Sequence, residues 1–388
     1  MNMPKLNHMK SILKHSKGKV FIATILLLMV GVFFYWDVLV FHAKDLLRDN
    51  KGWAITTSEE GNLVTKRIVS PTFHVNAVFP SMTGPWDAHY FNLERSAGPE
   101  LVWFTGYRCF VQDAESKNLL GDEFLCHNSL DYSIQDYYHN WGIKGRAGVF
   151  TSRLATMTQG QTEMSLPAGF GIPLQSDQAL SALTQVLNVN DPEADCHVEY
   201  VMEVDYIANA SSKEIKPLFQ QSISVLVEVD TNYVYHDSLP EVQDCMPVIA
   251  STSFMTNCRD GNTYTGHWQL PEGRDTVTYD VTDILSLPFN TTLHYAGVHV
   301  HPHCESLELW DRTTDSLIFR STIDNHKSLS KMKEITAYSS KSGVMMYSDH
   351  RYELVCETNG VSKSTKDMMA TMLLYLYDQE MDAVLSQL

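Results

Sequence analysis

The sequence predicts a mainly β protein: two antiparallel β-sandwich domains of jelly-roll type that follow a single N-terminal transmembrane helix. Many short runs alternate apolar and polar residues, as half-buried antiparallel strands do. Clusters of Gly, Pro, Asn and Asp separate these runs, and long helical patterns are scarce. An apolar run near the N-terminus is long enough to cross a bilayer.

The N-terminal segment has the pattern of a membrane anchor. Residues 20–36 are apolar and uncharged, and the run continues through Asp37 to Phe41, so that residues 20–41 have the length of a transmembrane helix. Five lysines and no acidic residue precede it, which places residues 1–19 in the cytoplasm. The chain is therefore expected to be a single-pass type II membrane protein, its bulk in a secretory lumen, the periplasm or at the cell surface. A cleaved signal peptide is the alternative, and it exports residues 42–388 as well.

The remainder divides into a stalk and two halves. Residues 42–70 are polar and charged and are expected to form a juxtamembrane stalk. A small, polar, strand-breaking segment near 209–220 marks the boundary between an N-terminal β-sandwich domain, 71–208, and a C-terminal one, 217–380. Two stretches have a pattern compatible with a helix, 176–187 and 378–388. The runs expected to be strands are 72–79, 101–111, 196–208, 222–230, 276–285, 292–301, 316–323, 352–357 and 368–378.

The charge is strongly acidic outside the tail. The formal net charge is −17, and removing the five tail lysines leaves −22 (−17 − 5). This balance argues against nucleic acid and anionic membrane surfaces as partners. It does not identify a substrate.

Cysteines and glycosylation motifs agree with export. Seven cysteines fit two or three disulfides with at least one thiol left over, although the pairing is not readable from the sequence. Alternatively, Cys126 and Cys304, each next to a histidine, are thiols close to a metal. The sequons at Asn209 and Asn290 predict a glycoprotein if the route is a eukaryotic secretory one.

The segment GVHVHPH puts His299, His301 and His303 at alternate positions. On a strand, alternate side chains project from one face, and imidazole is a common ligand of copper and zinc. Pro302 bends or ends the strand, which removes His303 from the expected ligand set. The run KDMMATMLLYLYD (366–378) follows later, and a thioether is a soft ligand that favours Cu(I). The pattern predicts a copper site that lies entirely in the second half of the chain; the alternative is surface histidines with methionines in the core.

The order of HVHPH, then SDHRYELVCETNG (348–360), then DMMATMLLYLY (367–377) resembles the second domain of the type II copper, ascorbate-dependent monooxygenases. That family includes peptidylglycine alpha-hydroxylating monooxygenase and dopamine beta-monooxygenase. The resemblance spans about 72–380 and is carried by short motifs. It implies that His299 and His301 are the family's His-x-His copper ligands. It also implies that Met369, the last residue of its D-x-M motif, is the thioether ligand.

The first half departs from the family, in which three histidines hold a second copper that relays an electron. His127 matches one of these positions, while Cys126 stands beside it and Leu187 replaces the third histidine. Loss of the relay copper is therefore expected. The alternative is a relay site rebuilt from residues such as Cys126, His139 or Asn188.

The resemblance implies a membrane-anchored, extracytoplasmic, copper-dependent monooxygenase-like protein. It would hydroxylate a C–H bond of a small-molecule or peptide substrate with dioxygen and an external reductant such as ascorbate, because the chain has no flavin or haem signature. No catalytic residue beyond the metal ligands is assigned. The alternative is a non-catalytic copper-binding or surface recognition module built on the same double β-sandwich.

Overall fold

The computed structural model describes residues 52–81, 83–93, 99–143, 146, 153–208, 215–228, 255–257, 263–360 and 366–387. By their contacts, residues Gly52–Leu388 cluster as one unit. The expected anchor, 20–41, lies outside the described residues. Within the part of the chain that is described, no helix is long and apolar enough to cross a membrane.

The first half consists of short strands with one 3-10 helix and one α-helix. In chain order they are β1 (Ala54–Glu60), β2 (Leu63–Val69), β3 (Phe73–Val75), β4 (Trp86–Phe91), β5 (Leu101–Asp113), η1 (Asp122–Phe124), β6 (Leu125–Tyr132), α3 (Ile134–Asn140), β7 (Arg153–Met157), β8 (Glu163–Ser165), β9 (Phe170–Gln175), β10 (Leu180–Val186) and β11 (Cys196–Ile207).

The second half has the same character and ends in a helix. Its elements are β12 (Lys216–Ser224), β13 (Val227–Glu228), β14 (Met255–Asn257), β15 (Thr263–Thr265), β16 (Trp268–Leu270), β17 (Gly273–Asp280), α4 (Thr282–Leu285), β18 (Thr291–Val300), β19 (Cys304–Asp311), β20 (Ser316–Asn325), β21 (Met332–Ile335), β22 (Tyr338–Met346), β23 (Tyr352–Gly360), β24 (Lys366–Met368), β25 (Ala370–Tyr377) and α5 (Gln379–Leu385).

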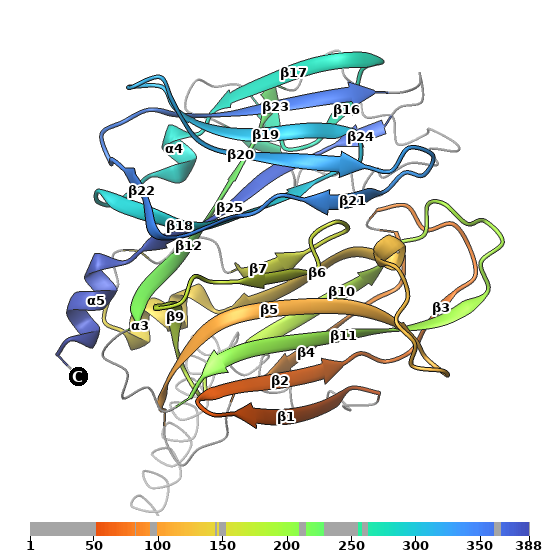
Figure 1. The fold of residues 1–388 in the computed structure, drawn as a ribbon, viewed down its shortest axis with the longest axis horizontal. Coiled ribbons are helices and arrows are strands. Elements are labelled where there is room, and N and C mark those ends of the chain that lie inside the picture. Colours follow the sequence, from red (N-terminus) through yellow and green to blue (C-terminus); the bar gives the residue numbers. More distant parts are fainter. Residues whose placement is uncertain are drawn as a thin grey trace, which may run out of the picture. The chain divides into compact units, whose positions relative to one another are not determined.

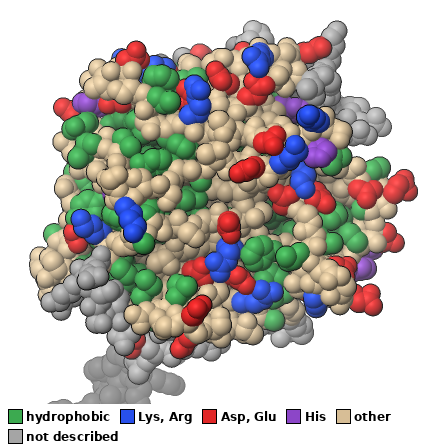
Figure 2. Space-filling view, in the orientation of Figure 1, with side chains coloured by type: hydrophobic (Ala, Val, Ile, Leu, Met, Phe, Trp, Pro, Cys, Tyr) green, Lys and Arg blue, Asp and Glu red, His purple; other side chains and the backbone are tan. Residues whose placement is uncertain are grey.

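One large sheet runs through both halves, in the order β1-β2-β11-β5-β9-β12-β25-β18-β22. The halves are joined in it by a short parallel pair, β9 with β12, whereas its other pairs are antiparallel. A sheet β4-β10-β6-β7 accompanies the first half, and a sheet β17-β23-β19-β20-β21 the second (Figure 1). The prediction of a mainly β protein is confirmed, and the layered sheets are consistent with β-sandwiches. On the face seen in Figure 2, acidic and basic side chains are interspersed.

Two sequence interpretations differ from the structure. Residues 54–69, expected within a stalk, form the β1–β2 hairpin, and β2 pairs with β11 in the large sheet. All residues of β1 are exposed, because β1 is an edge strand of the sheet and edge strands keep polar side chains. A polar, exposed strand has the same composition as a stalk. Residues 176–187 are not a helix: β10 lies between β4 and β6. Its Leu- and Ala-rich sequence favours a helix locally, and strand pairing on both sides overrides that preference.

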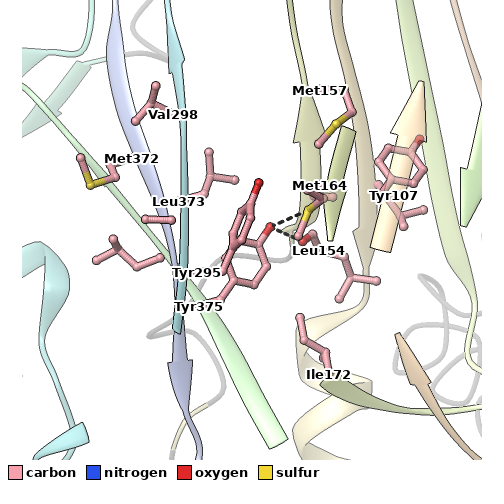
Figure 3. Packing of buried hydrophobic residues seen from close by; sticks show 14 of the residues in the cluster. Tyr107, Leu154, Met157, Met164, Ile172, Tyr295, Val298, Met372, Leu373 and Tyr375 are labelled. Atoms are coloured by element: carbon pink, nitrogen blue, oxygen red, sulfur yellow. Dashed lines mark hydrogen bonds between the residues drawn. The ribbon is translucent and has the colours of Figure 1, made fainter. Parts of the chain in front are cut away.

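The two halves pack against each other through an apolar layer (Figure 3). Tyr295 on β18 and Tyr375 on β25 are stacked edge to face, with ring centres 5.4 Å apart. The Tyr375 hydroxyl donates to the Leu154 carbonyl oxygen of β7 at 2.6 Å. Val298 and Met372 lie on the other side of the same two strands (Figure 3). Because strand side chains alternate, the face of β18 that carries Tyr295 also carries residues 297 and 299, and it is turned toward the first half.

Candidate functional site

Four histidines from the two halves lie next to one another at this junction. His127 belongs to β6, His299 to β18, and His301 directly follows β18, while His267 lies between β15 and β16. The ring centres of His127 and His299 are 6.2 Å apart, those of His299 and His301 are 6.0 Å apart, and those of His267 and His301 are 6.0 Å apart. The fold therefore gathers imidazoles from distant parts of the sequence into one row, which we call the four-histidine cluster.

Strand register explains why β18 contributes to this cluster. His299 lies opposite Thr371 of β25, and the His301 backbone N–H donates to the Met369 carbonyl oxygen at 3.3 Å. Residues directly opposite in an antiparallel pair share a face, so His299, His301 and Met369 belong to the same side of the sheet. The same face carries Gly297, where a side chain would collide with Gln161 of the first half.

A tight turn ends the histidine strand as Pro302 led us to expect. The Cys304 N–H donates to the His301 carbonyl oxygen at 3.4 Å, and His303 has a φ of 79°. Proline followed by a residue at positive φ is the pattern of a type II turn. The His303 N–H donates to Asn325 Oδ1 at 2.9 Å, and its side chain lines a separate cavity of about 370 Å³ with Glu305 and His326. His303 is thus placed apart from the cluster.

Burial keeps the inner imidazoles neutral. Burial is the largest cause that lowers the pKa of His299 well below its ordinary value, followed by the nearby His301, His127 and Arg153. Burial, then Arg153 and His301, lowers the pKa of His127 to about 4. Neutral imidazole offers a lone pair to a metal ion, whereas the protonated ring does not.

One buried nitrogen in the cluster lacks a partner. The His299 side chain as a whole is half-buried, yet its Nδ1 is enclosed and has no hydrogen-bond partner among the described residues. An enclosed polar atom without a partner costs free energy, commonly about 1–3 kcal/mol. A ligand of that nitrogen would remove this cost.

The spacing of the rings bears on metal binding. With a metal–nitrogen bond of about 2 Å, two imidazoles that share one ion have ring centres about 6.4 Å apart when they lie on opposite sides of it, and about 5 Å apart in a tetrahedral site. The three measured spacings, 6.0 to 6.2 Å, are close to the first value and longer than the second. Among the described residues, however, no group of three or more His, Cys, Asp or Glu side chains already surrounds one point as a metal site. Side-chain rotation is therefore needed before three of these rings share an ion.

The two adjacent methionines are in different environments. Met368 ends β24 opposite Trp268 and is fully buried. Met369 lies between β24 and β25, is only half-buried, and is the neighbour of His301 across the backbone. The methionine that the family resemblance singles out is thus the one beside the histidine turn.

The residues considered for a rebuilt relay site lie in separate environments. Leu187 is buried, and the Asn188 side-chain amide donates to the carbonyl oxygens of Ala77 and Asp191 at 3.0 and 2.6 Å. Cys126 Sγ lies 3.4 Å from the Ser81 hydroxyl. His139 is exposed on α3.

Sequence reasoning missed His267. It is a single histidine in the stretch GHWQL, without a second ligand at a recognisable spacing. Its position depends on the pairing of β16 with β24, which sets Trp268 opposite Met368. No local pattern indicates this long-range pairing.

No protein-family model matches this sequence, and no curated protein matches it. Among solved structures, the chain is similar to the peptide N-glycanase F (PNGase F) at 8% identity and a TM-score of 0.29, over 84% of this chain and 96% of that one. It is also similar to the STIV major capsid protein at 7% identity and a TM-score of 0.32, over 80% of this chain and 98% of that one. At these TM-scores neither similarity supports a conclusion about function.

Proposed function

We propose that this chain is a membrane-anchored, extracytoplasmic, copper-dependent monooxygenase-like protein with two jelly-roll-like halves and one copper centre between them. The single observation that carries the proposal is the four-histidine cluster, in which His127 of the first half lies beside His299 of the second, and His299 lies beside His301. The proposal of a single copper is supported at the expected relay position. Leu187 has no side-chain atom that binds a metal, and the Asn188 side-chain amide donates to the Ala77 carbonyl oxygen.

Each residue has a part that follows from its place. His299 and His301 supply two imidazoles from one sheet face, and His127 supplies a third from across the junction. Met369 supplies a thioether, which favours the reduced ion. Copper held there would supply activation of dioxygen for hydroxylation of a C–H bond, with ascorbate or a similar external reductant as the electron source.

The first experiment measures the copper content of the purified full-length chain after reconstitution and removal of weakly bound metal. We expect one copper per chain, and we expect His299→Ala to abolish it. His139→Ala is the matched control, because His139 is exposed on α3 and should not affect the content. A content of two coppers per chain would support a relay site as well, and a chain that binds no copper would contradict a metal centre.

A non-catalytic copper-binding or surface recognition module is the second candidate. It is favoured by the absence of a third histidine at Leu187, since a hydroxylase of this type needs a route for the second electron. Oxygen consumption by the copper-loaded protein with ascorbate distinguishes the two candidates. If the protein is an enzyme, a small-molecule or peptide substrate should increase its oxygen consumption. The His299→Ala variant should not consume oxygen. Copper binding without such consumption supports the module.

A further inference from the structure

Two buried cysteines meet directly behind the histidine turn. Cys304 is the first residue of β19, and Cys356 lies in the neighbouring strand β23. Their sulfur atoms are 3.7 Å apart, and both side chains are fully buried. The other described cysteines are Cys109, Cys126 and Cys196.

A bulge in the β19–β23 ladder lies next to this contact. Cys304 is opposite Thr358, but Ser306 is opposite Glu357 and Leu307 is opposite Cys356, so β19 contains one extra residue at Glu305. A bulge leaves the extra residue unpaired, bends its strand and increases the local twist. The Cys304 and Cys356 sulfurs are in contact as thiols, and a disulfide bond of about 2.0 Å requires them to approach by less than 2 Å.

We propose that Cys304 and Cys356 form a disulfide bond in the mature protein, which fastens the turn that carries His301 to β23. The reaction joins the two sulfurs and removes two protons and two electrons from the thiols. A disulfide-bearing oxidant, such as oxidised glutathione or a dithiol–disulfide oxidoreductase of the secretory route, accepts them and becomes a dithiol or two thiols. The inference concerns the scaffold and does not depend on copper.

Burial determines when the bond forms. Thiol–disulfide exchange requires a thiolate and access for the reagent. The neighbouring Cys356 and burial raise the pKa of the Cys304 thiol well above its ordinary value. Both sulfurs are also closed off from solvent. The bond therefore forms before β19 and β23 close, and the folded protein then protects it from external reductants.

The test uses the full-length chain recovered from the exported fraction of a host with an oxidising secretory route. The protein is denatured with an alkylating reagent, so that every free thiol is capped, and it is then digested without reduction. We expect mass spectrometry to find the Cys304 and Cys356 peptides linked to each other. Capping of Cys109, which is equally buried in β5, shows that the reagent reaches interior thiols after denaturation. Capped thiols at both Cys304 and Cys356, or linkage of either to another cysteine, overturn the proposal.

A second measurement separates the bond from mere burial. Protein refolded in a glutathione redox buffer should unfold at a temperature roughly 5–10 °C higher than protein refolded in excess dithiol. In the Cys304→Ala/Cys356→Ala variant the two preparations should unfold at the same temperature. Equal unfolding temperatures for the two wild-type preparations would contradict the crosslink.

Discussion

His127 and His299 lie with their ring centres 6.2 Å apart and their planes at 76°, although they belong to different halves of the chain. His127 is on β6 of the four-stranded sheet, and His299 is on β18 of the large sheet. The contact exists because the face of β18 that carries Tyr295 and His299 is turned toward the first half. A metal centre at this position would link the two halves directly.

Replacing Met369 should affect copper, whereas replacing its neighbour should not. Met369→Leu removes the thioether beside His301 and should weaken Cu(I) binding while the fold is kept, since the exchange nearly conserves volume. Met368→Leu, within the buried β24 position, should leave Cu(I) affinity unchanged at a cost below about 1.5 kcal/mol in stability. Competition titration with a Cu(I) chelator measures both. Equal affinities of the two variants would remove Met369 from the ligand set.

Tyr375→Phe should loosen the junction between the halves. The substitution removes the hydroxyl that donates to the Leu154 carbonyl oxygen in a buried layer. The expected loss is about 1–2 kcal/mol of the free energy of unfolding. Tyr347→Phe is the control: Tyr347 is exposed, and a surface change of this kind costs at most about 0.5 kcal/mol. Denaturant unfolding compares them, and an equal, small cost would show that this hydrogen bond does not stabilise the junction.

Asp378→Asn should be among the most destabilising single changes. Arg146 Nη1 donates to both carboxylate oxygens of Asp378 at 2.7 Å, and both side chains are buried. The guanidinium also lies over the ring of Phe219, 4.5 Å from its centre. Loss of the carboxylate leaves a buried charge without its counter-ion, which costs about 3–5 kcal/mol.

The control for Asp378→Asn is Glu380→Gln. Glu380 is 3.5 Å from the same guanidinium, but its side chain is 48% exposed. An ion pair open to solvent contributes at most about 1 kcal/mol, so its loss should be small. Thermal unfolding at neutral pH measures both variants. Similar unfolding temperatures for the two would contradict the importance of the Arg146–Asp378 pair.

The topology proposal predicts a protease pattern. In sealed vesicles whose cytoplasmic face is outward, added protease should remove residues 1–19 and spare the rest of the chain. The reason is the excess of lysines before the apolar run at 20–41. Detergent should make the large part accessible. Digestion of the large part in intact vesicles would contradict the proposed orientation.

The sequence predicted the mainly β fold because this depends on local patterns. Local patterns also singled out His299 and His301, whose binding of copper stays a prediction. Period-two alternation located β18, and the Pro302 pattern located its end. Features that depend on long-range pairing were not predictable. Examples are the parallel β9–β12 connection, the assignment of β10 as a strand, and the arrival of His267 through β16 and β24. The approach of His127 to His299 belongs to the same class, since it depends on how the halves pack.

X-ray absorption at the copper edge of the reconstituted full-length chain is the most direct measurement of the proposed centre. We predict scattering from imidazoles that include one from each half, with nitrogen at about 2 Å. His127→Ala should then lower the number of imidazoles around the bound copper by one, and His139→Ala should leave it unchanged. An imidazole count that His127→Ala leaves unchanged, or copper surrounded by oxygen ligands alone, would contradict a copper centre shared by the two halves.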